Sequence, residues 1–413
     1  MIKVGRHLIV VGIMYLCTLT MAARADNSNN EIRNSEVQST VKPATSQGTV
    51  PGVVINHIPA STGIYIGSPS IIKLPGGTLI ASHDEFGPGS TQTVWAVTRI
   101  FASKDNGATW SARAVLQGQF WSTLFLHQGS LYLIGTTREY GFVVIRRSDD
   151  DGVTWTDPTD PGHGLLLADG EYHCAPVPVI EYKGRIWRAM EKRDPPSEWG
   201  IHFCAGMLSA PVDADLLNTE SWKASNFLPS SRAWNRGDMG AWLEGNAVVS
   251  PSGEMLDVLR VQTHSPDEKA AIVHISADGG NASFDPASDF IAFPGGAKKF
   301  TIRYDKRSQC YWTLASIVTP QHRRLEPGSI RNTLALLSSK DLKHWELQRT
   351  LLYVPEEKRH GFQYVDWQFD GADIIYACRT AFDDEEGGAH NYHDANYLTF
   401  HRIKQFRNHN AGF

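Results

Sequence analysis

The sequence has few of the features that mark disulfide-rich, nucleic-acid-binding or membrane-spanning proteins. Its 413 residues include only five cysteines, and no two of them have the C-x-x-C spacing of a zinc or redox site. The formal net charge of −5 argues against the basic surface that nucleic-acid binding requires. The one long apolar run, residues 8–21, is too short to span a bilayer comfortably. We therefore expect buried thiols, no metal ion and no cofactor.

The first 50 residues have the composition of a targeting segment followed by a linker. Lys3, Arg6 and His7 precede the apolar run, and residues 23–25 form an A-x-A cleavage site. Residues 26–50 are rich in Asn, Ser, Thr and Gln, which is typical of a flexible tether. The sequence thus predicts a signal peptide at 1–25, a linker at 26–50 and a folded domain at 51–413. The mature protein is expected to be periplasmic or secreted, without membrane insertion after cleavage.

Four segments along the chain repeat one short turn motif. Each contains Ser and Asp side chains that can cap their own backbone, most often with a Gly that adopts a positive φ. In three of them a Trp follows, which can bury its ring on the next strand. The segments are Ser103–Trp110, Ser148–Trp155, the worn copy Ser276–Gly280, and Ser339–Trp345. A motif that returns at intervals of tens of residues predicts a fold built from repeats.

The remaining pattern is that of an all-β protein. From Val53 onward, short strand-like runs alternate with Gly, Pro, Asn and Asp, and no long stretch has helical periodicity. The runs group in fours between residues 68 and 353, and the second group is expected to end with a short strand near Trp155. A sixth group has only three runs, so we expect Val53–Ile58 to supply its fourth strand. These features predict a six-bladed β-propeller, with the ring closed by the N-terminal strand.

The strand polarity implied by the repeated turns predicts where a ligand binds. If the turns lie on one rim, the opposite mouth of the channel carries the starts of first and third strands and the ends of second strands. Arg side chains bind carboxylates in a bidentate manner, aromatic rings stack on sugars, and acids transfer protons, so the residues at this mouth suit an acidic sugar. The polar set selected in this way is Tyr65, His83, Asp84, Glu85, Arg99, Trp121, Arg138, Glu139, Tyr140, His173, Glu191, Lys192, Arg193, Trp242, Glu244, Asn246, Arg260, Gln262, Lys298, Lys299, Arg331, His360, Gln363, Tyr364, Asp366, Arg379, His390, His393 and Asp394.

The repeated turns resemble the Asp-boxes of the sialidase superfamily, and the likeness extends over about residues 51–405. Three segments carry it in detail: Leu243–Arg260, Arg331–Ser339 and Phe362–Trp367. A sialic acid carries a carboxylate on its anomeric carbon that would repel an Asp or Glu nucleophile, so sialidases use a Tyr whose proton is taken by a Glu. The resemblance implies Tyr364 as the nucleophile and Glu244 as its base. It also implies that Arg260 and Arg331 bind the substrate carboxylate.

The sequence departs from the sialidase pattern in two places. The Arg that precedes Ile-Pro in the first repeat of sialidases corresponds to Gly67, so one arm of the three-arginine clamp is absent. Arg99, Arg379 and Arg138 are the candidates to replace it. The acid/base Asp also has no clear match; Asp84 lies in about the right loop, and His83 is its rival.

The other expected substrate contacts are Gln363, Trp242, Asn246 and His393. Each candidate also has a structural interpretation. Tyr364 can pack beside Trp367, Glu244 can pair with a neighbouring Arg, and the arginines can form ion pairs between sheets.

Together these features predict an exported, monomeric exo-glycoside hydrolase that removes a terminal acidic sugar from a glycan. Two alternatives remain open at this level. A propeller-type polysaccharide lyase acting on uronate-containing glycans would use a His, such as His83 or His173, and a Tyr as base and acid. A non-catalytic propeller would only bind glycan, since a fold does not by itself imply a function.

Overall fold

A computed structural model describes residues 49–194 and 200–408. The chain divides into two compact units, residues 1–40 and 41–413, and every described residue belongs to the second. The predicted signal peptide and nearly all of the predicted linker therefore lie outside the described residues. Among the residues that are described, no helix is long and apolar enough to cross a membrane.

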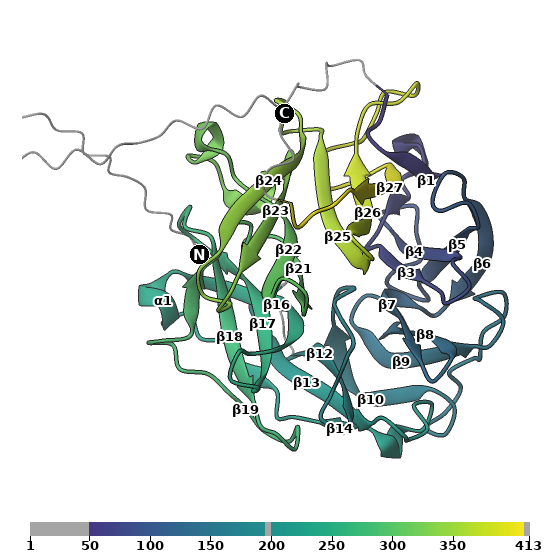
Figure 1. The fold of residues 1–413 in the computed structure, drawn as a ribbon, viewed down its shortest axis with the longest axis vertical. Coiled ribbons are helices and arrows are strands. Elements are labelled where there is room, and N and C mark those ends of the chain that lie inside the picture. Colours follow the sequence, from purple (N-terminus) through teal and green to yellow (C-terminus); the bar gives the residue numbers. More distant parts are fainter. Residues whose placement is uncertain (1–48, 195–199, 409–413) are drawn as a thin grey trace, which may run out of the picture. The chain divides into compact units, whose positions relative to one another are not determined.

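The described residues form antiparallel β-sheets with only short helical turns (Figure 1). The first sheet contains β2 (Tyr65–Ile66), β3 (Ser70–Lys73), β4 (Leu79–Phe86), β5 (Val97–Ser103) and β6 (Ser111–Gln117). The next contains β7 (Phe120–His127), β8 (Ser130–Thr136), β9 (Gly141–Ser148), β10 (Leu165–His173), β11 (Ile180–Tyr182), β12 (Arg185–Arg193), β13 (Phe203–Pro211), β14 (Lys223–Ala224) and β15 (Leu228–Pro229). The helical turns are η1 (Ala60–Thr62), η2 (Thr219–Ser221), α1 (Trp234–Gly237), η3 (Pro320–His322) and η4 (Pro327–Ser329).

The C-terminal half of the described chain contributes three further sheets. One contains β16 (Met239–Val249), β17 (Met255–Thr263), β18 (Lys269–Ile275), β19 (Ala282–Ser283) and β20 (Phe290–Ala292). The next contains β21 (Thr301–Asp305), β22 (Cys310–Ser316), β23 (Thr333–Ser339) and β24 (Glu346–Tyr353). The last contains β25 (Gly361–Asp370), β26 (Asp373–Ala381) and β27 (Tyr397–Ile403), together with β1 (Val53–His57).

The last sheet joins the two ends of the described chain. β1 pairs antiparallel with β27, with Val53 opposite Phe400 and His57 opposite Tyr397. At the opposite edge of this sheet, β25 packs against β3 of the first sheet, and β3 in turn contacts β7. Contacts of β12 with β16, of β16 with β21 and of β22 with β25 connect the other sheets. Apolar side chains from adjacent sheets fill these contacts, for example Trp187 of β12 and Met255 of β17 in one cluster.

One expected strand is absent. The short strand expected near Trp155 does not form, and residues 149–164 are turns and irregular backbone that contain Pro158 and Pro161. Pro has no backbone N–H to donate to a β-ladder, which explains why this stretch does not pair. The edge of β9 pairs instead with β10, and β10 also pairs with β12, so that two predicted groups merge into one nine-stranded sheet.

The repeated turns have the hydrogen bonds expected from their sequence. In the first copy, Ser103 Oγ donates to Asp105 (2.8 Å) and accepts from the Gly107 N–H (2.9 Å). The corresponding Ser–Asp pairs of the other copies are Ser148–Asp150, Ser276–Asp278 and Ser339–Asp341. The residue after the Asp has a positive φ in all four copies: Asn106, Asp151, Gly279 and Leu342. The motif therefore acts on the backbone of the turn.

The cysteines agree with the sequence prediction of thiols. Cys174, Cys204 and Cys378 are buried and unpaired, and Cys310 is half-buried and unpaired. Burial raises the pKa of the Cys174 and Cys378 thiols to about 12, so neither is a thiolate at neutral pH.

Candidate active site

Three strands, β7, β16 and β25, carry the same backbone distortion. A β-bulge interrupts β7 at Trp121, β16 at Glu244 and β25 at Tyr364, and each of these residues has a positive φ of 49–59°. A non-glycine residue in this conformation costs about 1–2 kcal/mol, and bulges of this kind re-aim a side chain. Such distortions cluster at functional sites. The bulges turn all three side chains toward one region.

The bulges bring Glu244 and Tyr364 together, although the two residues are 120 positions apart in the chain. The Tyr364 hydroxyl lies next to the Glu244 carboxylate, to which Arg260 Nη1 donates a hydrogen bond at 2.9 Å. Burial raises the pKa of Glu244, but Arg260, His173 and the Tyr364 hydroxyl outweigh it and hold that pKa below its usual value. Glu244 is therefore an ionised carboxylate in contact with a phenol, which is the arrangement of a general base with its nucleophile.

Three arginines surround the Tyr364 ring. The guanidinium of Arg379 lies 4.8 Å from the ring centroid, that of Arg331 lies 5.7 Å away, and Arg260 lies close enough to lower the pKa of Tyr364. Burial and Glu244 raise the pKa of Tyr364, while the three arginines lower it. All three guanidinium groups are buried, so their charges act in a region of low dielectric constant. A carboxylate placed beside Tyr364 would meet three positive groups.

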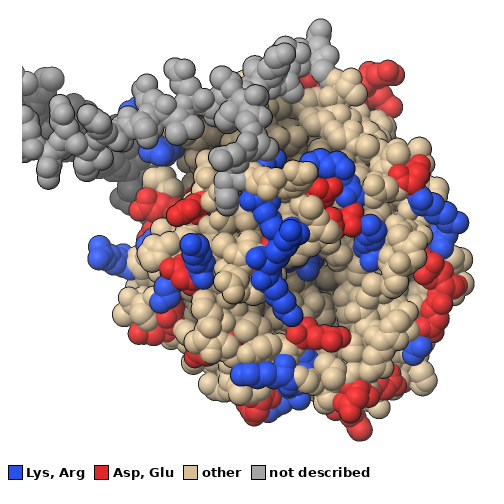
Figure 2. Space-filling view, in the orientation of Figure 1, with Lys and Arg blue, Asp and Glu red and all other residues tan. Residues whose placement is uncertain are grey.

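A cavity of about 150 Å³ opens beside Tyr364, and we refer to it as the Tyr364 cavity. Its walls are acidic, basic and aromatic, with side chains from several sheets. The lining residues are Gly67, Ser68, Phe86, Gln92, Phe120, Trp121, Glu139, His173, Tyr364, Arg379 and His393. Figure 2 shows Lys and Arg side chains gathered around a hollow near the centre of the face in view.

Arg379 lies in the wall of the Tyr364 cavity, next to Gly67, where the sequence lacks an arginine. Both Gly67 and Arg379 line the Tyr364 cavity. A Cβ atom on Gly67 would lie 2.6 Å from the Asp84 carbonyl oxygen, so no side chain fits there without a shift of the backbone. Arg379 reaches the cavity from β26, where its guanidinium lies 4.4 Å from the Phe86 ring centroid and donates to the His393 carbonyl. Arg99 instead pairs with Glu85 and lines a separate cavity with Asn56 and His57.

The two acid/base candidates lie in different surroundings. Asp84 is buried, and its carboxylate accepts from Thr98 Oγ1 at 2.9 Å and from the Trp121 N–H at 2.8 Å. Burial, offset in part by these hydrogen bonds, raises the pKa of Asp84 to about 7. His83 points away from Tyr364, toward the Asn56 side chain at 2.9 Å and the Phe101 ring, and burial lowers its pKa to about 4. His83 is thus a packed residue between β1 and β4.

The remaining predicted contacts divide into two groups. Gln363 accepts from Arg331 and donates to the Tyr392 carbonyl, so it orients an arginine, and His393 lines the Tyr364 cavity. Trp242 is buried in the apolar core, and its indole N–H donates to the Phe203 carbonyl. The Asn246 side chain accepts from the Ile302 N–H and donates to the Phe300 carbonyl, which ties β16 to β21. The substrate contacts expected of Trp242 and Asn246 are therefore corrected to packing and sheet-to-sheet roles.

The structure does not place Tyr364 as a packing partner of Trp367, but it does pair Glu244 with a neighbouring Arg. Trp367 is buried in an apolar cluster with its indole N–H on the Thr301 carbonyl, whereas the Tyr364 ring lies against Arg379 and Arg331. Glu244 does pair with Arg260, but it also lies next to the Tyr364 hydroxyl. Within the described ranges, no group of three His, Cys, Asp or Glu side chains is arranged to hold a metal ion.

The sequence-based choice of site residues omitted several residues of the Tyr364 cavity. The strand-polarity rule had selected Trp121, Glu139 and His173 for this mouth, but the motif comparison gave them no role. Phe86 ends β4 and Gln92 lies in the connection from β4 to β5, where no motif marks them. Loops carry functional residues without a periodic signal, so only the folded chain brings these side chains to the cavity.

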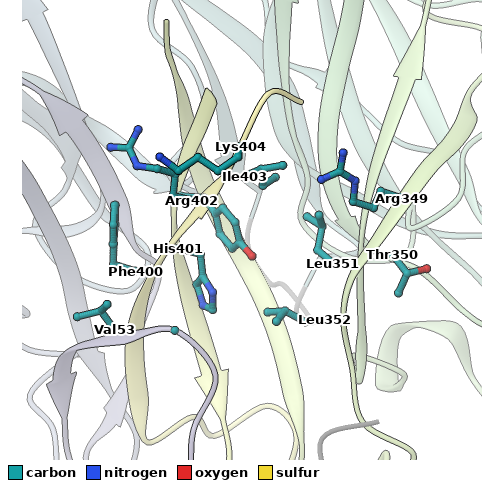
Figure 3. Close-up of a pocket in the computed structure, with 12 residues that line it drawn as sticks. Val53, Arg349, Thr350, Leu351, Leu352, Phe400, His401, Arg402, Ile403 and Lys404 are labelled. Carbon is teal, nitrogen blue, oxygen red and sulfur yellow. The ribbon is translucent and has the colours of Figure 1, made fainter. Parts of the chain in front are cut away.

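A larger cavity of about 480 Å³ lies at the periphery and contains none of these groups (Figure 3). Its side chains come from β1, β24, β26 and β27, among them Arg349, Leu351, His401 and Arg402. The Tyr364 cavity is smaller but holds the paired acid and phenol together with the arginines. We therefore assign the chemistry to the Tyr364 cavity.

Comparisons with known proteins identify the fold. No protein-family model and no curated protein sequence matches this chain. Among solved structures, an α-L-arabinanase of Penicillium chrysogenum complexed with arabinobiose is 16% identical, with a TM-score of 0.52 over 86% of this chain and 98% of the arabinanase. The Hadza microbial sialidase Hz136 is 14% identical, with a TM-score of 0.56 over 86% of this chain and 68% of the sialidase. An α-L-arabinofuranosidase from Fusarium graminearum is 13% identical, with a TM-score of 0.55 over 86% and 97% of the two chains. At these identities the likeness establishes a shared fold.

Proposed function

We propose that this protein is an exported exo-glycoside hydrolase that releases a terminal acidic sugar from glycans. The observation that carries the proposal is the buried Tyr364 phenol beside the ionised Glu244 carboxylate, inside a ring of three arginines. An anionic sugar would place its carboxylate against the arginines and its anomeric carbon beside the phenol oxygen. Tyr364 would attack that carbon as Glu244 takes the phenolic proton.

Separate observations support the hydrolase activity, the propeller fold and the export that this proposal contains. The shared fold includes an arabinanase, an arabinofuranosidase and a sialidase, all of which act on glycosidic bonds by their names. The sheet contacts, in which β25 packs on β3 and β1 completes the last sheet, support a closed six-bladed propeller. The signal-like sequence of residues 1–25 supports export.

The test is the variant Tyr364→Phe, assayed with aryl glycosides of acidic sugars, an aryl sialoside first. The substitution keeps the ring and removes the oxygen that attacks. We expect turnover to fall by at least 1,000-fold, on the scale of covalent and proton-transfer catalysis, while the thermal unfolding midpoint stays close to that of the wild type. Wild-type turnover in the variant would refute the nucleophile.

A polysaccharide lyase is the second candidate, because His173 lines the same cavity as Tyr364 and the arginines. In a lyase a His would remove the proton next to a uronate carboxylate, and a Tyr would protonate the leaving oxygen. Incubation with uronate polysaccharides distinguishes the two functions, since elimination produces an ultraviolet-absorbing unsaturated sugar and hydrolysis does not. Tight glycan binding without any turnover would instead indicate a binding protein.

A further inference from the structure

The Tyr364 cavity contains a second proton-transfer unit besides Glu244 and Tyr364. His173 and Glu191 lie directly opposite each other on β10 and β12. The His173 Nδ1 atom is 2.8 Å from a Glu191 carboxylate oxygen, and both side chains are almost fully buried. Cross-strand neighbours of this kind hold each other in one geometry. The pair is therefore a fixed unit of the cavity wall.

Packing and hydrogen bonding leave one nitrogen of His173 available. The ring stacks on Phe203 at 4.4 Å and meets the edge of Trp121 at 4.4 Å, which holds its plane. Glu191 is held in turn, because its other oxygen accepts from the Gly245 N–H at 3.0 Å. None of the residues that the structure describes hydrogen-bonds Nε2, and His173 lines the Tyr364 cavity. Nε2 is thus the ring atom that can meet a ligand.

We propose that His173, positioned by Glu191, is the acid/base of this site: it protonates the departing glycosidic oxygen and later deprotonates the attacking water. This inference rests on the proposed hydrolase function. It assigns a role that the sequence comparison had given to Asp84 or His83.

The charges around His173 suit a group that donates a proton. Glu191 faces the ring from β12 and Glu244 from β16. Beyond Glu191 lie the Arg188 guanidinium and Asp257, whose pKa is raised well above its usual value by burial and by Glu191. A proton on the ring therefore lies between two carboxylates. His393, the other imidazole of the cavity, lies beside Arg379 and Arg331, and burial together with these charges lowers its pKa. His393 is therefore neutral at the pH at which a donor is needed.

Asp84 is less suited to the role. Its two oxygens already accept from Thr98 and from the Trp121 N–H, and it is buried against the backbone of the cavity wall. These bonds fix the bulge at Trp121, whose ring packs on His173. Asp84 is thus a positioning residue for the wall on which His173 lies.

The two steps balance without any co-reactant except water. In the first step the bond from the Tyr364 oxygen to the anomeric carbon forms and the glycosidic bond breaks. The phenolic proton moves to Glu244, and the proton on His173 Nε2 moves to the leaving oxygen. In the second step water attacks the same carbon, its proton goes to Nε2, the bond to Tyr364 breaks, and Glu244 returns the proton to the phenol.

The test compares leaving groups in His173→Asn. We expect kcat/KM to fall by about 100- to 10,000-fold for an alkyl glycoside, which needs protonation to leave. For a dinitrophenyl glycoside, whose leaving group departs as an anion, we expect a loss of less than about 10-fold in the glycosylation step. Azide should restore turnover of the dinitrophenyl substrate and produce a glycosyl azide, detectable by mass spectrometry, because an anionic nucleophile needs no base.

Two more variants complete the design. Glu191→Gln keeps the shape of the side chain and removes the charge that stabilises the proton on His173. The descending limb of the pH profile of kcat/KM should therefore move to lower pH. This measurement tests the proposal even if His173→Asn does not fold. The control is His127→Asn, a buried His that also pairs with a Glu (Glu181, 2.8 Å) but lies at the opposite end of β7 from Trp121. It should leave both the pH profile and the dependence on leaving group unchanged.

The outcomes separate this inference from the proposed function. If the wild type turns over acidic glycosides but His173→Asn keeps the wild-type dependence on leaving group, the assignment of His173 is refuted and the hydrolase stands. The same holds if Asp84→Asn, rather than His173→Asn, loses activity selectively on the alkyl glycoside. If the wild type turns over no glycoside at all, the hydrolase proposal fails and the assignment fails with it.

Discussion

Arg379 provides the sharpest test of how this site binds an anion. Its guanidinium is buried, lies between the Phe86 and Tyr364 rings, and keeps its charge at neutral pH because burial lowers its pKa only to about 10. Its Nε atom is buried and has no hydrogen-bond partner among the described residues, so part of its donor capacity is available to a ligand. The variant Arg379→Met keeps most of the apolar volume against both rings and removes the charge.

The expected loss follows from the strength of one charge-assisted hydrogen bond. Such a bond contributes about 1.5–3 kcal/mol, and each 1.4 kcal/mol corresponds to a factor of ten. We therefore expect kcat/KM for an acidic aryl glycoside to fall by about 10- to 100-fold. The methyl ester of the same substrate has no carboxylate for Arg379 to bind, so the variant should affect it by less than about 3-fold.

The assay is the ratio of kcat/KM for the acid to that for the ester, measured for the wild type and the variant. Arg99→Met serves as the matched comparison, because Arg99 pairs with Glu85 at another cavity and should change acid and ester equally. An equal loss on acid and ester in Arg379→Met would refute the reasoning. So would a selective loss in Arg99→Met.

Two further predictions concern stability. Burial raises the pKa of Asp84 to about 7, so the unfolded chain loses this proton near pH 4 and the folded protein only near pH 7. Ionisation of the unfolded state therefore lowers the free energy of unfolding by up to about 4 kcal/mol as the pH rises through this window. Asp84→Asn removes that loss, and denaturant unfolding at pH 5 and pH 8 should show the variant gaining on the wild type at the higher pH; a pH-independent difference would contradict it. Gly67→Ala should lower stability by about 1–3 kcal/mol because its Cβ meets Asp84, whereas Gly76→Ala, whose Cβ meets no atom within 4 Å, should be neutral within about 1 kcal/mol in the same thermal unfolding measurement.

Much of the fold was predictable because its signals are local. The turn motif depends on side chains two to four residues apart, such as Ser103 and Asp105, and it recurs with the same hydrogen bonds. Strands such as Phe120–His127 and Glu346–Tyr353 form where apolar patterning and turn residues mark a strand-like run. The prediction of a strand near Trp155 was wrong because β10, a segment with weaker patterning, pairs with the edge of β9 instead.

The candidate site was only partly predictable, because its members depend on backbone distortions and long-range contacts. Glu244 and Tyr364 were selected through their resemblance to a known pattern, but the bulges that aim them at each other appear only in the structure. Trp242 and Asn246 lie on either side of the bulge in β16, and Trp242 enters the apolar core whereas the Asn246 side chain bonds to β21. Position along a strand was readable from the sequence, whereas the direction of a side chain at a bulge was not.

The sequence by itself determined that this chain forms antiparallel sheets with repeated turns, because turn chemistry and strand alternation act over a few residues. It also located an acid, a phenol and several arginines at one end of the strands. The tertiary structure decided which arginine completes the set around Tyr364. Arg379 and Gly67 line the same wall although they lie far apart in the chain, and the Asp84 backbone leaves no room for a side chain at Gly67. It likewise decided that His173 faces the cavity and His83 does not, since that difference depends on how neighbouring sheets pack.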